Sequence, residues 1–307
     1  MPGVLVIGGA NMDIVAHSDT LLLRSDSNPG QVRCAAGGVA RNVAHNLALL
    51  GHPAALVSVL GQDAFGQAVL QATQAAGVDT RHCTLLSDAS TATYLSLHGP
   101  DGDMAVAVND MAILARLDAG LLAPLSAELA AARCLVLDCN LHEEALAFLL
   151  GGDFCAPLFV DAVSAFKCPR LLPWLGALHT LKLNRLEAAA LTGLPVTTLA
   201  ETQAAALALH RLGVRQVVLS LGEQGVVWCD AQGVTGLRAA GRVPVVNTGG
   251  AGDALLAGLV HAHLQGWDLP HAVAWAMACA EITLQSPTAN AFDLSTATVQ
   301  ARWAEAH

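Results

Sequence analysis

Asp253 has the clearest chemical setting in this chain. It follows the glycine-rich turn GGAG at 249–252 and precedes an almost wholly apolar run that starts at Ala254. Backbone N–H groups at the start of a helix attract an anion, and glycines let that anion approach closely. A carboxylate in this first helical turn is either a helix cap or a general base beside the anion.

A second glycine turn lies near the N-terminus and is also accompanied by polar side chains. Gly37 and Gly38 open a predicted helix in which Asn42 faces the same side one turn later, so the backbone can pass close to a ligand. Asn11 and Asp13 follow the first predicted strand. An amide and a carboxylate at one strand end suit two neighbouring hydroxyl groups, although local turn capping explains the same residues without a ligand.

A third polar pair, Asn184 and Glu187, starts a predicted helix after the strand in LKLNRLEAAALTG. The three-residue spacing is that of a capping box, which needs no further chemistry. Across the sheet edge from the turn at 249–252, the same two side chains would also suit a water-coordinated Mg²⁺ beside phosphate groups.

The elements that must position these groups alternate between strand and helix. Apolar patterns predict helices over 37–51, 63–77 and 254–266, the second of which is closed by Gly77. Strands are predicted at Val4 to Ile7, Ala55 to Leu60, Cys134 to Leu137, Leu158 to Asp161, Thr180 to Leu183, Gln216 to Ser220 and Val243 to Val246. The alternation is typical of an α/β fold whose mainly parallel sheet is sandwiched by helices, here in a single domain over residues 1–307.

Two stretches interrupt the alternation, at about 13–36 and 91–110. In the second stretch, Pro100, Asp101 and Gly102 turn between two strand-like runs. Each stretch is too short to be a domain. We therefore expect two hairpins that pair into a small β lid over the mouth of the larger sheet, where ligands bind.

Composition argues against several classes of protein. The net charge of -10 and the presence of only 15 lysines and arginines argue against a nucleic-acid groove and leave anions to backbone dipoles and a metal ion. No apolar run is long enough to span a bilayer, and the N-terminus lacks a basic signal region, so we expect a cytoplasmic protein without a membrane partner. The 8 cysteines include no CxxC pair, which favours reduced thiols over a metal site.

Common nucleotide-binding and hydrolase motifs are absent. The opening VLVIGGANMD lacks the later glycines of a dinucleotide-binding fingerprint. No GxxxxGK[ST], GxSxG or HExxH occurs either. These absences argue against a Rossmann cofactor site and a Walker-type nucleotide site.

The segments GGVARN at 37–42 and NTGGAGD at 247–253 together resemble the two signatures of the PfkB or ribokinase-like family of small-molecule kinases. The NxxE element at 184–187 and the LSLGEQG loop at 219–225 extend the resemblance over nearly the whole chain. The resemblance implies a phosphotransferase that uses ATP and Mg²⁺ to phosphorylate an alcohol group. It also implies a homodimer, since lids in this family often pair between subunits.

The resemblance implies roles for individual residues. The implied catalytic residues are Asp253, as the base, and Gly250, Ala251 and Gly252, as an anion hole. The implied acceptor-binding residues are Asn11, Asp13, Gly37, Gly38, Asn42, Asn140 and Asp110. The implied ATP-binding residues are Asn184, Ser220, Gly222, Gly225, Lys167 and Asn290, the last of them over the adenine. Glu187, together with Asn184, would hold Mg²⁺ indirectly through water.

Within the family, GGANMDIV, VNDMAIL, VDAVSAFK and Asn140 are most similar to the pseudouridine kinase branch, which makes pseudouridine 5′-phosphate and ADP. The alternative acceptors are ribose, another nucleoside and a phosphorylated sugar, and for the last only Arg41 is an obvious basic partner. A ligand-binding regulator with weak catalysis is the alternative from a different class.

Two residues depart from the family's pattern. Asn247 replaces the usual first aspartate, which weakens the case for a K⁺ site that would depend on that carboxylate. Gly249 replaces a threonine or valine and would loosen the turn before Asp253, which gives the regulator some support. The intact Asp253, Asn184 and Glu187 argue against a regulator.

Overall fold

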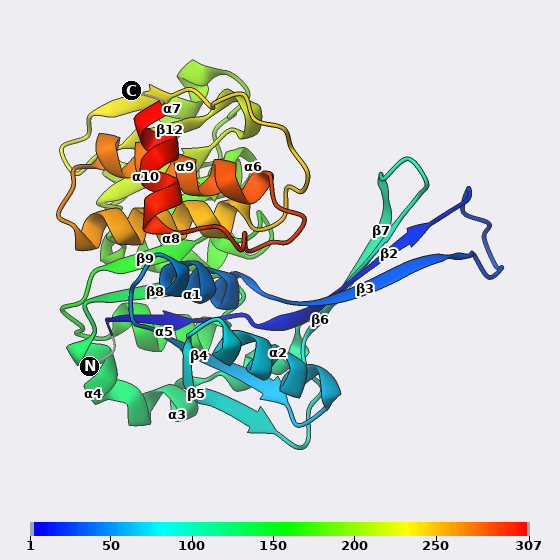
Figure 1. Cartoon of the computed structure of the whole chain (residues 1–307). Coiled ribbons are helices and arrows are strands. Elements are labelled where there is room, and N and C mark those ends of the chain that lie inside the picture. The colour runs from blue at the N-terminus through cyan, green and yellow to red at the C-terminus, as the bar shows by residue number, and fades with distance from the viewer. Residues whose placement is uncertain (1–2, 306–307) are drawn as a thin grey trace.

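Within the described residues, 3–305 of the computed structural model, nine short strands form the central sheet (Figure 1). Their order is β13-β12-β11-β10-β9-β8-β1-β4-β5. The strands are β1 Val4–Ile7, β4 Ala54–Gly61, β5 Asp79–Leu86, β8 Cys134–Asp138, β9 Leu158–Asp161, β10 Thr180–Asn184, β11 Gln216–Ser220, β12 Val226–Cys229 and β13 Thr235–Arg238. Neighbours from β5 to β11 are parallel, whereas β12 and β13 extend the edge as antiparallel strands.

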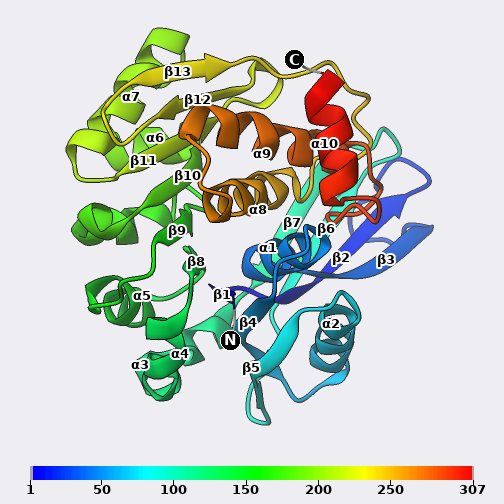
Figure 2. The same cartoon turned by 60° about the vertical axis from the view of Figure 1, so that its left-hand side comes forward.

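Helices cover both faces of this sheet (Figure 2). One layer contains α1 Val39–Leu49, α2 Ala64–Ala75, α8 Ala251–Leu264, α9 Leu269–Leu284 and α10 Thr296–Glu305. The other contains α3 Ala119–Leu122, α4 Ser126–Ala131, α5 Glu143–Gly151, α6 Arg185–Thr192 and α7 Leu199–Arg211. Segments of 3₁₀ helix occur at η1 Ala112–Arg116, η2 Ala123–Leu125, η3 Cys168–Ala177 and η4 Gly222–Gln224. Along the described residues, none of these helices combines the length and apolar character that a membrane crossing requires.

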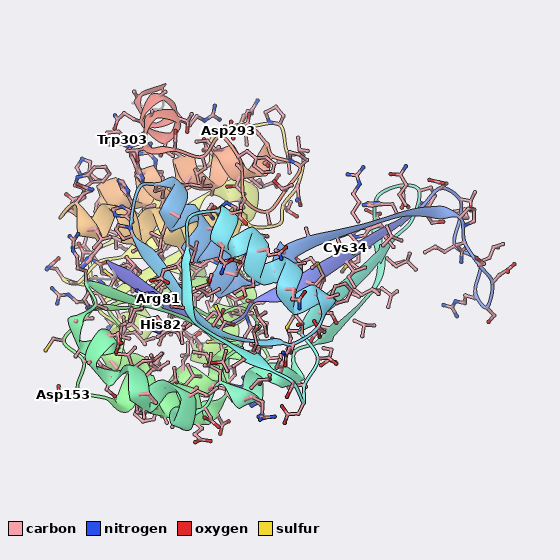
Figure 3. The ribbon with its side chains drawn as sticks, turned by 60° about the horizontal axis from the view of Figure 1, so that its bottom comes forward. Cys34, Arg81, His82, Asp153, Asp293 and Trp303 are labelled. Atoms are coloured by element: carbon pink, nitrogen blue, oxygen red, sulfur yellow. The ribbon has the colours of Figure 1, made fainter. Side chains whose placement is uncertain are left out.

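The two interruptions of the alternation form a second, four-stranded sheet, in the order β3-β2-β6-β7. The hairpin of β2 Asn11–Ser18 and β3 Gly30–Gly37 joins the hairpin of β6 Thr93–His98 and β7 Met104–Asp110 through parallel pairing of β2 with β6. This sheet projects from the body (Figure 1), and Cys34 lies on the projecting strand β3 (Figure 3). The two hairpins thus pair into one lid sheet, as the sequence predicts.

The two faces of the lid differ in polarity. Residues that pair across neighbouring strands lie on the same face of a sheet. In the order β3, β2, β6, β7, one face of the lid carries two apolar rows: the first is Val32, Ala16, Leu97 and Val106, and the second is Cys34, Ile14, Leu95 and Val108. Val106 and Val108 on this apolar face are 50% and 62% exposed. The opposite face carries Asp13, Tyr94 and His17. One chain by itself therefore leaves an apolar surface of the lid open to solvent.

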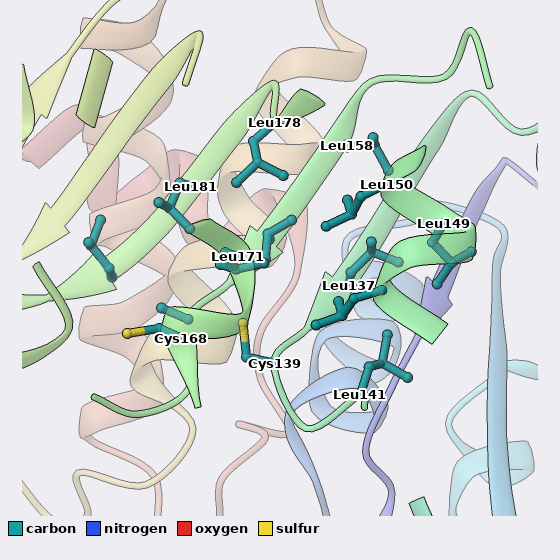
Figure 4. Close-up of a cluster of buried hydrophobic side chains, with 14 of the residues drawn as sticks. Leu137, Cys139, Leu141, Leu149, Leu150, Leu158, Cys168, Leu171, Leu178 and Leu181 are labelled. Carbon is teal, nitrogen blue, oxygen red and sulfur yellow. The ribbon is translucent and has the colours of Figure 1, made fainter. Parts of the chain in front are cut away.

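Adjacent residues of a central strand point into different halves of the core. In β1, Leu5 and Ile7 pack in the cluster that contains α5 and α7, while the alternate residues of the strand pack with α8 and α9. Figure 4 shows part of the first cluster, where Leu137 of β8 lies near Leu149 and Leu150 of α5. Burial on both faces explains why these strands are continuous apolar runs.

The predicted strand at Val243 to Val246 is wrong. No strand partner is assigned to it in the described part of the chain, and Val246 is 61% exposed. Pro244 has no N–H to donate to a ladder, whereas the backbone N–H of Val246 donates to the carbonyl of Leu284 at the end of α9. The connection before α8 is therefore an irregular loop held by α9.

Candidate active site

The carboxyl ends of three neighbouring parallel strands bring charged side chains to one edge of the sheet. Asp138 of β8 is in register with Asp161 of β9, and Asp161 is in register with Lys182 of β10. Asp138 and Asp161 are 1% and 2% exposed. In open α/β sheets this edge is where ligands bind, so the row marks the candidate site.

Asp253 lies in the first turn of α8, next to this row. The turn begins at Gly250, which has a φ of 81°. A Cβ added to Gly250 would lie 1.9 Å from the carbonyl oxygen of Ala289, so only glycine fits this position. Asn42 of α1 donates from Nδ2 to Asp253 Oδ2 at 2.8 Å. The two predicted glycine turns, more than 200 positions apart, therefore meet at one carboxylate.

The surroundings of Asp253 shift its protonation. Burial raises the pKa of this carboxyl to about 7, and the negative charges of Asp161 and Asp138 act in the same direction. The hydrogen bond from Asn42 and the charge of Lys182 partly offset the increase. A carboxyl that titrates near neutral pH suits a general base.

Lys182 is a candidate site residue that the sequence analysis missed. Its Nζ donates to Asp161 Oδ2 at 2.9 Å, and a Cβ added to Gly252 would lie 2.7 Å from the same Nζ. Burial would lower the pKa of Lys182, but Asp161, Asp253 and Glu187 together raise it, so the ammonium stays charged. The signal in the sequence was a lysine between two buried leucines, just before Asn184.

The predicted acceptor-binding residues of the first hairpin lie together. Asn11 Nδ2 donates to Asp13 Oδ1 at 2.6 Å, and a Cβ on Gly37 would fall 2.0 Å from Asp13 Oδ2. Gly38 passes over the backbone of Gly9, whose carbonyl would lie 2.5 Å from its Cβ. Burial raises the pKa of Asp13 above its usual range.

Asn140 and Lys167 form a pair next to these residues. Lys167 Nζ donates to Asn140 Oδ1 at 2.6 Å, and a Cβ on Gly9 would lie 3.0 Å from Asn140 Nδ2. Because an ammonium only donates, it fixes the orientation of the Asn140 amide. Lys167, predicted on the ATP side, thus lies with the predicted acceptor residue Asn140.

Asn184 and Glu187 form the capping box that starts α6. Asn184 Oδ1 accepts from the backbone N–H of Leu186 and Glu187, while Glu187 accepts from both the backbone and the side-chain nitrogen of Asn184. Glu187 is 2% exposed, and burial raises its pKa. No group of three or more histidine, cysteine or acidic residues that could hold a metal occurs within residues 3–305. Oxygen donors already used by the capping box fit Mg²⁺ held through water better than Mg²⁺ bound directly.

The predicted nucleotide loop packs against a segment that lines a cavity. Ser220 Oγ donates to the carbonyl of Leu183, and η4 follows from Gly222. A Cβ on Gly225 would lie 2.8 Å from the backbone nitrogen of Ala240. The stretch that contains Ala240 lines a cavity of about 380 Å³, together with α9 residues such as Met277.

Asn290 and Asp110 both have hydrogen-bond partners within the protein. Asn290 Oδ1 accepts from Arg41 Nη1 at 2.6 Å, and its Nδ2 donates to the Asn42 carbonyl and to Asn46 Oδ1. Its amide therefore fixes α1, and an adenine contact by this amide remains a prediction. Asp110 is exposed at the end of β7, where Oδ1 accepts from the backbone N–H of Ala112.

Asn247 acts as a local cap in the loop before α8. Its Oδ1 accepts from the backbone N–H of Gly249 at 2.9 Å, and its Nδ2 donates to the carbonyl of Pro287 at 3.4 Å. A neutral amide with these two partners stabilises the turn without adding negative charge.

Comparison with known proteins gives a match over almost the whole chain. The model of the pfkB family of carbohydrate kinases matches residues 1–297. Pseudouridine kinase of Escherichia coli K12 is 40% identical over 296 residues, which cover 96% of this chain and 95% of that protein. The uncharacterized sugar kinase YeiI of the same organism is 38% identical over 286 residues, covering 93% and 79%.

Solved structures have the same architecture. A carbohydrate kinase from Agrobacterium tumefaciens superimposes with a TM-score of 0.87 at 29% identity, over 99% of this chain and 97% of that one. Arabidopsis thaliana ribokinase, complexed with ribose and ATP, gives a TM-score of 0.87 at 22% identity over 98% of each chain. The predicted α/β fold with a mainly parallel sheet, helices on both faces and a small lid is confirmed.

Proposed function

The chain belongs to the pfkB family of carbohydrate kinases and is a phosphotransferase with an alcohol group as acceptor, and from this premise we propose that it transfers the γ-phosphoryl group of ATP to the 5′-hydroxyl of pseudouridine. The choice of acceptor rests on the 40% identity with the pseudouridine kinase of Escherichia coli over nearly the full length of both proteins.

The observation that carries the proposed mechanism is the position of Asp253. Its carboxylate is held by Asn42 from the acceptor side and lies in the same helical turn as Gly252, against which Lys182 packs. Asp253 accepts the proton of the 5′-hydroxyl while that oxygen attacks the γ-phosphorus, and ADP leaves on the opposite side.

The first turn of α8 stabilises the charge that develops on the transferred group. The backbone N–H groups of Gly250, Ala251 and Gly252 supply fixed dipoles, and the ammonium of Lys182 adds a full positive charge beside them. Asn184 and Glu187 would hold Mg²⁺ through water, and the ion would there neutralise charge on the ATP phosphates.

The acceptor and nucleotide occupy opposite sides of Asp253. Asn11 and Asp13 bind the ribose hydroxyls, and Asn140, oriented by Lys167, contacts the base or sugar. Ser220, Gly222 and Gly225 border the phosphates, and the adenine enters the cavity of about 380 Å³ beside Ala240. We expect the amide-rich acceptor side to favour a neutral nucleoside.

A phosphorylated sugar is a weaker acceptor in this site. Arg41, the basic residue that the sequence suggests for a phosphate, is 4% exposed and donates to Ala36 O, Asn42 Oδ1 and Asn290 Oδ1. Its guanidinium is thus committed to protein oxygens.

The lid closes the site and joins two subunits. Its polar face carries Asp13 toward the acceptor, so closure excludes water that would otherwise hydrolyse ATP. Its apolar face, with Val106 and Val108 exposed, suits burial against the lid of a second copy, which makes the protein a homodimer.

The test is a coupled ADP-release assay with Mg-ATP and pseudouridine, uridine, adenosine, ribose or fructose 6-phosphate. Wild type and Asp253→Asn are measured in parallel, with Asp230→Asn, in a distant turn, as a matched control. ³¹P NMR of the product identifies the phosphorylated oxygen. Turnover with pseudouridine, retained in the control and lost in Asp253→Asn, is expected.

A sugar acceptor is the second candidate, because the relative described as a sugar kinase is 38% identical. Turnover with ribose and not with pseudouridine would overturn the proposed acceptor while keeping the base. Silence across the panel, with pseudouridine still bound in calorimetry, would favour a ligand-binding regulator.

A further inference from the structure

Asp138 is a buried carboxylate that the phosphoryl-transfer mechanism leaves without a role. It ends β8 and is 1% exposed. Its Oδ2 accepts from the backbone N–H of Gly9 at 2.8 Å and of Ala40 at 2.9 Å, and its Oδ1 accepts from the backbone N–H of Asn140 at 2.8 Å. One side chain thus fixes three segments that are far apart in the sequence.

Each of these segments carries part of the proposed acceptor site. Gly9 leads into Asn11 and lies against Asn140. Ala40 belongs to the first turn of α1, the same turn that presents Asn42 to Asp253. The N-cap residue of α1 makes no side-chain hydrogen bond to this turn. Asp138 therefore replaces the missing cap of α1 from another strand.

The neighbouring Asp161 offers a contrast at the same sheet edge. Its Oδ2 pairs with Lys182, which lies against the phosphate-binding turn, and its Oδ1 accepts from the backbone N–H of Val163. Both aspartates therefore cap the loop after their own strand. Asp161 reaches toward the phosphate side with its second oxygen, whereas Asp138 reaches toward the acceptor side.

From this division of contacts we infer that Asp138 is a positioning residue for acceptor binding: it fixes the Gly9, Ala40 and Asn140 segments in the relative arrangement that binds the nucleoside. The inference rests on the proposed kinase function. It assigns Asp138 no contact with substrate, so its effect is on acceptor affinity and on the setting of Asp253.

Asp138→Asn removes one of the three bonds and the charge. An amide oxygen can still accept from Gly9 and Ala40, but the amide nitrogen then faces the N–H of Asn140, donor against donor. The KM for the acceptor should rise about tenfold or more, as for a lost hydrogen bond to a charged group, and the KM for ATP should stay within about twofold.

A pH profile separates this role from a purely structural one. Asp253 is faced by Asn42 from α1, Asp138 from β8, Asp161 from β9 and Lys182 from β10. Because the charge of Asp138 raises the pKa of Asp253, its removal should move the acid limb of kcat/KM to lower pH.

The experiment compares wild type, Asp138→Asn, Asp138→Ser and Asp161→Asn, with Asp230→Asn as the control for an aspartate that caps a turn elsewhere. Steady-state kinetics use the best acceptor of the wild type, and calorimetry measures pseudouridine and Mg-ADP separately. We expect an acceptor-specific loss in both Asp138 variants and an ATP-side or kcat loss in Asp161→Asn.

Several results would overturn the inference. These are equal losses for acceptor and nucleotide, an unmoved acid limb, and failure of both Asp138 variants to fold by circular dichroism. A wild type that turns over no acceptor refutes the proposed function instead, and calorimetry then decides the role of Asp138 independently. A wild type that binds neither ligand refutes both.

Discussion

The edge of the central sheet and the projecting lid differ in how firmly the protein holds their side chains. Every residue of β8 and β9 is buried, whereas all but one residue of β7 is exposed. Helices cover the central strands on both sides, and the lid hairpins extend beyond them (Figure 1). Groups that need fixed geometry, such as Asp253 and Lys182, therefore lie on the body.

This difference separates chemistry from closure. Phosphoryl transfer depends on groups held to within fractions of an ångström, which buried strand ends and a helix start can provide. A lid that opens for each substrate needs a segment that can move relative to the body, and the largely exposed strand β7 suits that requirement better than the buried central strands do. Changes to the body should therefore abolish turnover, while changes to the lid should alter assembly and acceptor affinity.

The largest expected effect follows from Asp253→Asn. Loss of the general base should reduce turnover on the order of a hundredfold or more, while the hydrogen bond with Asn42 can be retained. Single-turnover kinetics with the best acceptor measure this. A variant with more than a tenth of wild-type turnover would remove Asp253 from the role of base.

The same substitution should stabilise the body. Burial raises the pKa of Asp253, so the folded protein loses stability as pH rises from about 4 toward 7 and the carboxyl must ionise while buried. Asp253→Asn should therefore have a higher Tm than wild type at pH 8, and this gain should disappear near pH 4. Such a gain marks a site that gives up stability for activity.

The next largest effect concerns pH. If Asp253 must be ionised, kcat/KM should fall about tenfold per unit as pH drops below about 7. The body sets this limb through burial and the charges of Asp161 and Asp138, so lid variants should share it. Initial rates from pH 5 to 9 test the expectation, and a flat profile through pH 6 would contradict it.

A smaller effect is expected from the lid. Val106→Asp places a charge on the apolar face, where an unpaired buried charge costs about 2 kcal/mol or more, roughly a thirtyfold weaker dimer. Sedimentation velocity should show monomers at micromolar concentration. Gln31→Asp, on the opposite face of the same sheet, is the matched control and should stay dimeric. Equal dissociation in both would exclude this face as the interface.

Much of the body was predictable because its signals are local. The apolar strands, the capping box of Asn184 and Glu187, and the turn before Asp253 are each encoded within a few residues. The polar edge strand β5 Asp79–Leu86 was missed, because one side faces solvent and no apolar run marks it. Val243 to Val246 was the reverse case, an apolar run without a partner strand.

The candidate site was less predictable, because its key contacts join residues far apart in the chain. Nothing local to Asp138 indicates that it caps α1 a hundred residues earlier, and nothing near Lys182 indicates that it packs on Gly252. Asn290 is a motif residue whose side-chain amide is already hydrogen-bonded to Arg41 and Asn46 of α1, which its position in the sequence does not indicate. Motif positions alone do not reveal which partners a side chain already has.

The smallest effect is expected from Gly249→Ala. This substitution adds a side chain at the position where Gly249 replaces the threonine or valine that is usual in the family, just before the turn that leads to Asp253. An added Cβ would lie 3.2 Å from Asn247 Oδ1, a tight contact that a small shift of the amide relieves, and the backbone is outside the left-handed region. Reduced freedom of the unfolded chain should raise stability by about 0.5 kcal/mol, with turnover within about threefold of wild type. Thermal unfolding and the ADP-release assay measure both quantities. A large loss of activity would mean that this turn must flex during phosphoryl transfer, so that the body, like the lid, has a moving part.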